Sequence, residues 1–477
     1  MTIIINSGID FDLETYRRLA WGGEDLEFTP QCLRQIKAWR EEFLETMAAH
    51  QGEPIYGVNV GAGDGSFNRL DANTETSYLN GLNSATSFGR PLPERVVRGM
   101  IFARLASFVD GSSAVTPALT QHIAEMLRKP LPEVPAEGTG GSGEILPLGH
   151  LFHAVPSELS LGPKESMSLI NGAPCAGALV SDTAIRARAL VSVLELSFAL
   201  ACDALNVPDG HFDQSLGSTW GFPAEASALR RMRELLCNPS KKRNNHQARV
   251  SVRILPRVLA AAYEAVAAAE SAAASAIRGP GDNPIFVSAS REEGPARIIS
   301  NGSFHNHSAI IAIDGVGRAL ADLTQLSQHF IHALYQDKTA MPDQDNLALG
   351  AAYMAAADWS EEARLHAAPS ILSFAAVGQN DVTNPLFAAW RSANRIEECL
   401  LAQMAILSTM ASQSLHATHR QTTRSLAGYL TLVRETVQPI DARRDIGFEI
   451  GHLMKRLREE QEATCTSASS IKTPADA

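Results

Sequence analysis

The sequence predicts a mainly α-helical protein, with a long central helical bundle and an N-terminal loop-rich domain that carries the active site. Alanine-rich periodic stretches such as residues 257–266 recur from about residue 190 to 460, and alanine is the strongest helix former. Glycine and proline cluster instead before about residue 175 and around residues 278–281. Irregular backbone that can build a site is therefore expected in those segments.

Three regions follow from this distribution. Residues 1–190 are expected to form the loop-rich catalytic region, and residues 191–460 the helical bundle. Long Ala/Leu-rich stripes leave apolar faces that one thin bundle cannot cover, so the bundle is expected to associate with copies of itself. The segment 461–477 is polar and without periodicity, and is expected to be a frayed tail.

The charge balance limits the partners of the chain. A net charge of -11 argues against nucleic acid or an anionic membrane, because either needs a clustered basic surface, and the one basic run is residues 241–243. The chain has no apolar run of about 18 residues and no secretion signal, so we expect a cytoplasmic protein. Its six cysteines lack paired spacing, which fits free thiols.

The most informative segment is residues 138–150, where glycines flank Ser142 before an apolar run. Gly141 and Gly143 lack the Cβ atoms that would stop the backbone from bending back on itself. The Gly143 nitrogen could then attack the Gly141 carbonyl carbon and close a five-membered ring. Loss of two waters would leave an electrophilic methylidene-imidazolone, MIO. Taken alone, the same pattern is also typical of a flexible connection.

Further motifs occur in the order found in one enzyme family. They are Tyr-Gly-Val-Asn-Val-Gly at 56–61, Arg-Pro-Leu-Pro-Glu at 90–94, Gly-Pro-Lys-Glu at 162–165, Leu-Ile-Asn-Gly at 169–172, Ser-Val-Arg at 251–253, Asp-Asn-Pro at 282–284 and Asn-Gly-Ser-Phe-His at 301–305. Together with Gly141 to His150, they make the chain resemble the histidine/phenylalanine ammonia-lyases over roughly residues 50 to 390.

The resemblance implies a catalytic set. Tyr56 would take the β-proton of the substrate; a phenol ordinarily has a pKa near 10 and must be activated by its site to act as a base. Gly141, Ser142 and Gly143 would form MIO as a protein-derived cofactor. Arg253, expected at a helix edge facing the cavity, would hold a substrate carboxylate with its two-pronged guanidinium.

The resemblance also implies residues around the electrophile and the substrate. Asn171 and Gln247 match polar positions of the family, although isolated amides are more often caps or core partners. Phe304 matches an aromatic position beside the electrophile, where it would shield the ring. Metal is not expected, because the histidine pairs at helical spacing lack the glutamate of an H-E-x-x-H motif. The family implies a homotetramer whose sites combine loops from several subunits.

Several positions depart from the family pattern and point to an atypical, polar substrate. Gly141 replaces the usual alanine and Glu144 the usual aspartate, which leaves MIO formation open. Val250 stands where the family has a second catalytic tyrosine. Ser84 is at the substrate-selecting position, and Asn380 is at a position where neither the histidine nor the phenylalanine pocket is reproduced.

Four functions therefore remain open at this point. The leading hypothesis is a carbon–nitrogen lyase that eliminates ammonia or an amine from an α-amino acid or derivative and gives an α,β-unsaturated acid. An MIO-type aminomutase would use the same residues. An ergothionase-like lyase would expel trimethylamine from a betaine without MIO, because a quaternary amine cannot add to an electrophile. A catalytically silent binding protein is the alternative from another class.

Overall fold

The computed structural model divides into two compact units. It describes residues 2–50, 52–70, 85–237, 243, 246–279, 281–291, 294–337, 347–374, 378–441 and 444–467. The first unit comprises Met1–Thr183, Ala269–Ile313 and Ser370–Arg391, and the second Ala184–Ala268, Asp314–Pro369 and Ser392–Ala477.

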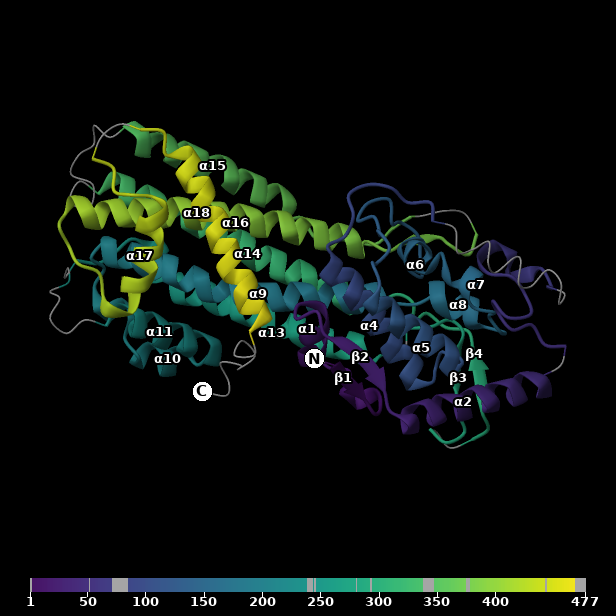
Figure 1. The fold of residues 1–477 in the computed structure, drawn as a ribbon. Helices are drawn as coiled ribbons and strands as arrows, with labels where there is room; N and C mark the ends of the chain where they lie inside the picture. Colours follow the sequence, from purple (N-terminus) through teal and green to yellow (C-terminus); the bar gives the residue numbers. More distant parts are fainter. Residues whose placement is uncertain are drawn as a thin grey trace. The chain divides into compact units, whose positions relative to one another are not determined.

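Helices dominate both units, which confirms the predicted fold class (Figure 1). The elements within the first unit are β1 (Thr2–Ile5), α1 (Leu13–Ala20), β2 (Asp25–Phe28), α2 (Pro30–Ala49), α4 (Glu94–Asp110), α5 (Pro117–Glu125), α6 (Ile145–Phe152), α7 (Val155–Glu158), α8 (Glu165–Ile170), β3 (Ile285–Val287), β4 (Arg297–Ile299), β5 (Ser373–Phe374) and β6 (Val382–Thr383). Those within the second unit are α10 (Ser215–Trp220), α11 (Pro223–Leu236), α12 (Val250–Arg253), α15 (Leu347–His366), α17 (Ala427–Thr436) and α18 (Gly447–Thr466). Four long helices have residues in both units: α9 (Pro174–Ala204), α13 (Leu255–Arg278), α14 (His307–Gln336) and α16 (Leu386–Ala417).

Helix α4 is the centre of the first unit, because it is buried from Val96 to Val109. It packs against α1, where the Tyr16 hydroxyl donates to the Ala178 carbonyl at 2.9 Å, and Gly99 leaves room for the Tyr16 ring. Strands β1 and β2 form a two-stranded parallel pair that contacts α5 through β2, and β3 pairs antiparallel with β4. A helix that is buried on all sides belongs to the core of its unit and not to the protein surface.

The predicted boundary near residue 190 falls inside α9, which runs without interruption through it, and the first unit also contains Ala269–Ile313 and Ser370–Arg391. The N-terminal region is also more helical than its glycine and proline content indicated: α2 has 20 residues and α4 has 17. Composition averages over a region, and here the glycines and prolines gather in loops between long helices.

The predicted frayed tail begins too early. Helix α18 continues to Thr466, and Cys465 is fully buried. Gln461 is 2% exposed and donates to the Arg186 carbonyl and to Glu397, both at 3.0 Å. A polar residue whose amide finds buried partners can anchor a helix that lacks an apolar stripe. Residues 468–477 lie outside the described residues.

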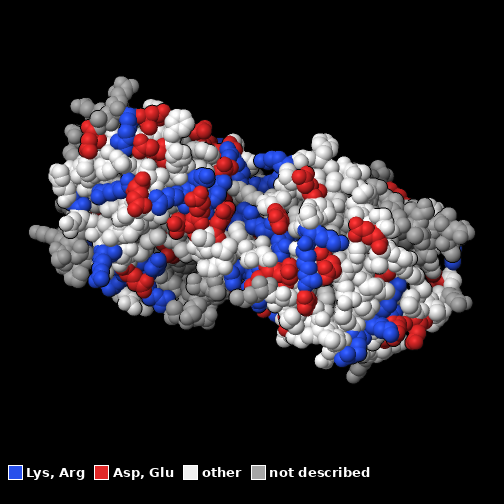
Figure 2. Space-filling view, viewed as in Figure 1, with Lys and Arg blue, Asp and Glu red and all other residues white. Residues whose placement is uncertain are grey.

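Charged groups of both signs are mixed on one face of the molecule. On the face in Figure 2, Lys and Arg lie among Asp and Glu. Of the basic run 241–243, only Arg243 is described; it is buried and pairs with Asp203 at 2.9 Å and Asp209 at 2.8 Å. Among the described residues, no helix is both long enough and apolar enough to span a membrane.

Candidate active site

The Ser142 loop has the backbone that its glycines permit. Gly141 and Gly143 have φ of +93° and +72°, a region that residues with a Cβ rarely adopt. A Cβ on Gly143 would lie 2.6 Å from Asn171 Oδ1. The Gly143 carbonyl accepts from the Gly172 N–H at 3.0 Å, and the Gly141 carbonyl accepts from the Asn384 N–H at 3.1 Å. The loop is therefore held from both sides.

Glu144 fastens the same loop to the start of helix α9. It has φ of +54°, is 4% exposed, and accepts from the Cys175 N–H at 2.6 Å and the Ala176 N–H at 2.9 Å. These are N–H groups of the first turn, which lack partners within the helix. Burial raises the pKa of Glu144 to about 7, although both N–H groups favour the carboxylate.

A cavity of about 410 Å³ opens beside the Ser142 loop in the first unit. Five residues singled out in the sequence line it together: Tyr56, Ser142, Asn171, Phe304 and Asn380. The remaining lining residues are Ala62, Gly63, Asp64, Ile145, Met167, Ile170, Asn283, Ser300, Asn301 and Gln379. Most of the polar groups are neutral amides and hydroxyls.

The two hydroxyls expected to act in catalysis have hydrogen-bond partners in the cavity wall. Tyr56 packs against Ala62 and Met167, and its phenol oxygen accepts from the Gly63 N–H at 2.9 Å. The Ser142 hydroxyl donates to Asn380 Oδ1 at 3.1 Å. A hydrogen bond donated to a phenol oxygen favours the phenolate, the form of a tyrosine that can accept a proton.

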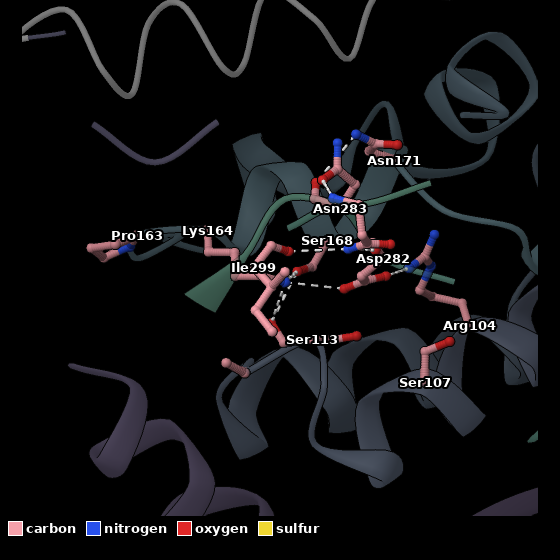
Figure 3. A network of polar contacts seen from close by, with 12 residues as sticks. Arg104, Ser107, Ser113, Pro163, Lys164, Ser168, Asn171, Asp282, Asn283 and Ile299 are labelled. Carbon is pink, nitrogen blue, oxygen red and sulfur yellow. Dashed lines mark hydrogen bonds and ion pairs between the residues drawn. The ribbon is translucent and has the colours of Figure 1, made fainter. Parts of the chain in front are cut away.

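The amide wall contains residues to which sequence reasoning gave no role. Asn171 Nδ2 donates to the Asn283 carbonyl at 3.2 Å (Figure 3), and the buried Asn171 Oδ1 has no hydrogen-bond partner among the described residues. Asn283 Oδ1 accepts from the Ser300 hydroxyl at 3.1 Å and from the Asn301 N–H at 2.9 Å. The Asp-Asn-Pro and Asn-Gly-Ser motifs were the available signal, because they contain these residues.

Asp64 is the only Asp, Glu, Lys or Arg among the described residues that line the cavity. It is exposed and accepts from the Gln379 N–H at 3.1 Å. The Gln379 side chain donates to the Ser66 hydroxyl at 2.7 Å. These contacts join the tyrosine loop to the segment that contains Asn380.

The other predicted binding residues belong to different parts of the chain. Arg253 ends helix α12 in the second unit, and its Nε donates to the Ala248 carbonyl at 3.1 Å. With its carbonyl oxygen turned towards Arg253, Gln247 accepts from both terminal guanidinium nitrogens at 2.8 and 2.9 Å. Val250, at the position of the missing tyrosine, is 60% exposed. Ser84 lies outside the described residues.

The described residues contain no group of three His, Cys, Asp or Glu side chains placed to bind a metal ion. Of the histidine pairs, His416 contacts Asp441 at 2.9 Å, whereas His150 Nε2 is buried and has no hydrogen-bond partner within the described ranges. All six cysteines are free, and five of them are buried.

Comparison with known proteins decides the family. The family model described as aromatic amino acid lyase matches residues 11–158 and 153–436. The chain belongs to the aromatic amino acid lyase family. It is 26% identical to a histidine ammonia-lyase of Geobacillus thermodenitrificans over 363 residues, which is 70% of each chain. It is therefore an ammonia-lyase-type enzyme, a carbon–nitrogen lyase.

Solved structures show that this lyase shares its fold with enzymes of differing activity. An ergothionase from Treponema denticola superimposes with a TM-score of 0.86 at 18% identity, covering 97% of this chain and 99% of that one. A phenylalanine aminomutase of Pantoea agglomerans gives a TM-score of 0.85 at 19% identity, with 96% and 100% covered. At these identities the likeness concerns the fold.

Lyases of this family generally use MIO, act on amino acids and are typically oligomeric. The residues around Ser142 fit that group. The flanking glycines have the positive φ values of a tightly bent loop, and the buried Asn171 Oδ1 lies against Gly143 with no hydrogen-bond partner in the described part of the chain. A buried acceptor without a donor is rare, and such an atom can serve a polar group formed at the loop.

Proposed function

We propose that this enzyme eliminates ammonia from an α-amino acid with a polar side chain and releases the α,β-unsaturated acid. The observation that carries the proposal is the shared cavity of Tyr56 and Ser142, with the Ser142 loop bent through two positive-φ glycines. Fold and family alone are compatible with several chemistries, so the proposal depends on this site.

Each of these cavity residues has its own role in the proposed reaction. Tyr56 removes the β-proton, the electron pair of that C–H bond forms the double bond, and the α C–N bond breaks as the amine leaves. MIO from Gly141, Ser142 and Gly143 supplies the electrophile that makes the amine a better leaving group. Phe304 covers the cavity wall and limits water there. Asn171 and Asn380 offer hydrogen bonds to polar substrate atoms.

The carboxylate of the substrate needs a cation, and the described cavity lining contains none. We propose that Arg253 of another copy of this chain supplies it, in a homotetramer. Because Nε donates to the Ala248 carbonyl and both terminal nitrogens donate to Gln247, a substrate carboxylate would take the place of the Gln247 amide on the face of the two terminal nitrogens. The amides of the cavity wall favour a polar substrate rather than a large apolar one, and the sequence resemblance adds Ser84 at the substrate-selecting position.

Asp64 favours a second candidate, the loss of a quaternary amine from a betaine. Its carboxylate is the single formal charge of the described lining, and it shares the cavity with the aromatic rings of Tyr56 and Phe304. Carboxylates and aromatic faces both attract a permanent cation. Such a reaction would need Tyr56 but not Ser142.

Substrate profiling tests the proposal. The purified protein is incubated with a panel of α-amino acids and their trimethylated betaines, while released ammonia, released trimethylamine and the ultraviolet absorbance of the unsaturated acid are recorded. Ammonia release that is lost in Ser142→Ala supports the proposal. Trimethylamine release that survives in Ser142→Ala replaces it with the second candidate, and a β-amino acid product identifies an aminomutase.

A further inference from the structure

Three charged side chains are buried behind the cavity wall, where the proposed reaction does not use them. They are Arg104 on α4, Lys164 before α8, and Asp282 before the β3 strand, and each is at most 1% exposed. Asp282 pairs with Arg104 through one carboxylate oxygen and with Lys164 at 3.1 Å through the other (Figure 3). Lys164 also donates to the Ser113 carbonyl at 2.9 Å and to the Ser168 hydroxyl at 2.8 Å.

Burial of this network costs free energy, because the charged groups lose their hydration. Burial lowers the pKa of Lys164, while Lys164 and Arg104 overcome the effect of burial on Asp282 and hold its pKa below the usual value. Arg104 Nε and Nη2 have no hydrogen-bond partner among the described residues. An apolar core of the same volume would be no less stable, so the network calls for a reason other than stability.

One arm of the network reaches the Ser142 loop through Arg104. A Cβ on Gly172 would collide with the Arg104 guanidinium, so the guanidinium packs directly on the backbone at this point. The N–H of Gly172 donates to the Gly143 carbonyl at 3.0 Å. Arg104, paired with Asp282, is therefore connected to the Gly143 carbonyl through a single residue, Gly172.

A second arm reaches the same glycine through the chain itself. Asp282 is followed by Asn283, whose carbonyl accepts from Asn171 Nδ2 at 3.2 Å. That contact fixes the amide so that Asn171 Oδ1 faces Gly143. The Asn301 amide group donates to the Asp282 carbonyl at 3.2 Å and ties the β3–β4 hairpin to the arm.

We propose that Arg104, Asp282 and Lys164 are positioning residues, which hold Gly143 and the Asn171 amide in the geometry that ring closure at Ser142 requires. The inference rests on the proposed function for its chemistry, but the positioning itself concerns hydrogen bonds that exist whether or not the ring closes. Ring closure joins the Gly143 nitrogen to the Gly141 carbonyl carbon and releases water, so a small displacement of Gly143 separates the reacting atoms.

Arg104→Lys tests the first arm, because it keeps the charge and removes the guanidinium plane that packs on Gly172. Two readouts are taken on the full-length protein: the fraction of chains that weigh two waters less than the sequence, and amide hydrogen exchange at Gly172. We expect a smaller dehydrated fraction and about tenfold faster exchange, which corresponds to about 1.4 kcal/mol of lost protection. Ile101→Val is the matched control, since it removes one buried methyl group from the same helix.

The outcomes separate the inference from the proposed function. Unchanged exchange and unchanged mass in Arg104→Lys would overturn the positioning role, as would equal changes in Ile101→Val. Faster exchange in Arg104→Lys, in a wild-type protein that shows no mass deficit, would keep the positioning role and remove MIO from the proposed function.

Lys164→Met tests the second arm. It is also the alternative test of the inference if Arg104→Lys does not fold. It takes away one of the two cations that hold Asp282, and should speed exchange at the Asn301 N–H, which donates to Asn283 Oδ1. Unchanged exchange there contradicts the inference. Failure of both variants to fold, while Ile101→Val folds, would make the network a purely structural element and would also contradict it.

Discussion

The cavity of the first unit and the Arg253 segment of the second unit differ in the part of the proposed reaction that each would perform. The cavity would break the bonds, and Arg253 would bind the substrate carboxylate. The cavity is lined by hydroxyls, amides and apolar side chains, and Asp64 is its only formal charge among the described residues. The second segment presents a cation on a four-residue helix, with its guanidinium already held by Gln247 and the Ala248 carbonyl.

The two regions therefore differ in the interaction that each would contribute to the reaction. In the proposed reaction the groups that break bonds lie in surroundings that are mostly neutral, where a hydrogen bond is electrostatically strong. Arg253, the proposed carboxylate-binding group, belongs to the second unit, where Gln247 and the Ala248 carbonyl hold its guanidinium. A change in the cavity should therefore alter bond breaking, and a change at Arg253 should alter binding of the carboxylate.

The largest effect is expected from Tyr56→Phe, which removes the proton acceptor and keeps the ring. Turnover should fall by about 10²- to 10⁴-fold, the range for a lost general base, with the mass deficit at Ser142 retained. Tyr335→Phe is the matched control, because its ring stacks on Tyr353 in the second unit. Steady-state kinetics check this. Turnover within about threefold of wild type in Tyr56→Phe would assign the base elsewhere.

A smaller loss is expected for Arg253→Lys. An ammonium keeps the charge but cannot reproduce the two-pronged contact, so kcat/KM should fall by about 10- to 150-fold, for about 1.5–3 kcal/mol of lost charge-assisted hydrogen bonding. The mass deficit should be unchanged, since the cavity is untouched. Arg249→Lys, an exposed neighbour that contacts Gln336, is the control. An unchanged kcat/KM would show that Arg253 does not bind the carboxylate.

Glu144→Gln should change stability with pH rather than abolish folding. The pKa of Glu144 rises from its ordinary 4.5 to about 7 on folding, so the folded state holds the proton more tightly than the unfolded state. The stability contributed by this proton is present below about pH 4.5 and is lost as the pH rises towards 7. Unfolding in denaturant at several pH values should show that loss in wild type and not in the variant. Parallel pH profiles would contradict the assignment.

The smallest effect is expected for Asp64→Asn, and it distinguishes the two candidate reactions. Asp64 is exposed, so its charge should change ammonia release from an α-amino acid by no more than about fivefold, the factor for about 1 kcal/mol. Asn68→Ala, in the same loop, is the control. A much larger loss, confined to betaine substrates, would favour the quaternary-amine reaction.

Sequence reasoning singled out the Ser142 loop and five of the fifteen residues that line the cavity, because these residues carry unusual local chemistry. The glycines at positions 141 and 143 indicate a bent backbone, and Ser142 lies between them. It assigned no role to Lys164 or Asp282, although both fell within quoted motifs. Hydrophobic patterning places charged residues at the surface, and burial of an ion network depends on tertiary partners that are distant in sequence. Helix α18 extends to Thr466 for the same kind of reason, since the partners of Gln461 are on other helices.

The most direct test of the central claim is the intact mass of the purified wild-type protein. The proposed function predicts a mass two waters below that of the sequence, a deficit that disappears in Ser142→Ala together with ammonia release. A wild-type protein with the full mass of its sequence, still releasing an amine at an undiminished rate in Ser142→Ala, would contradict it.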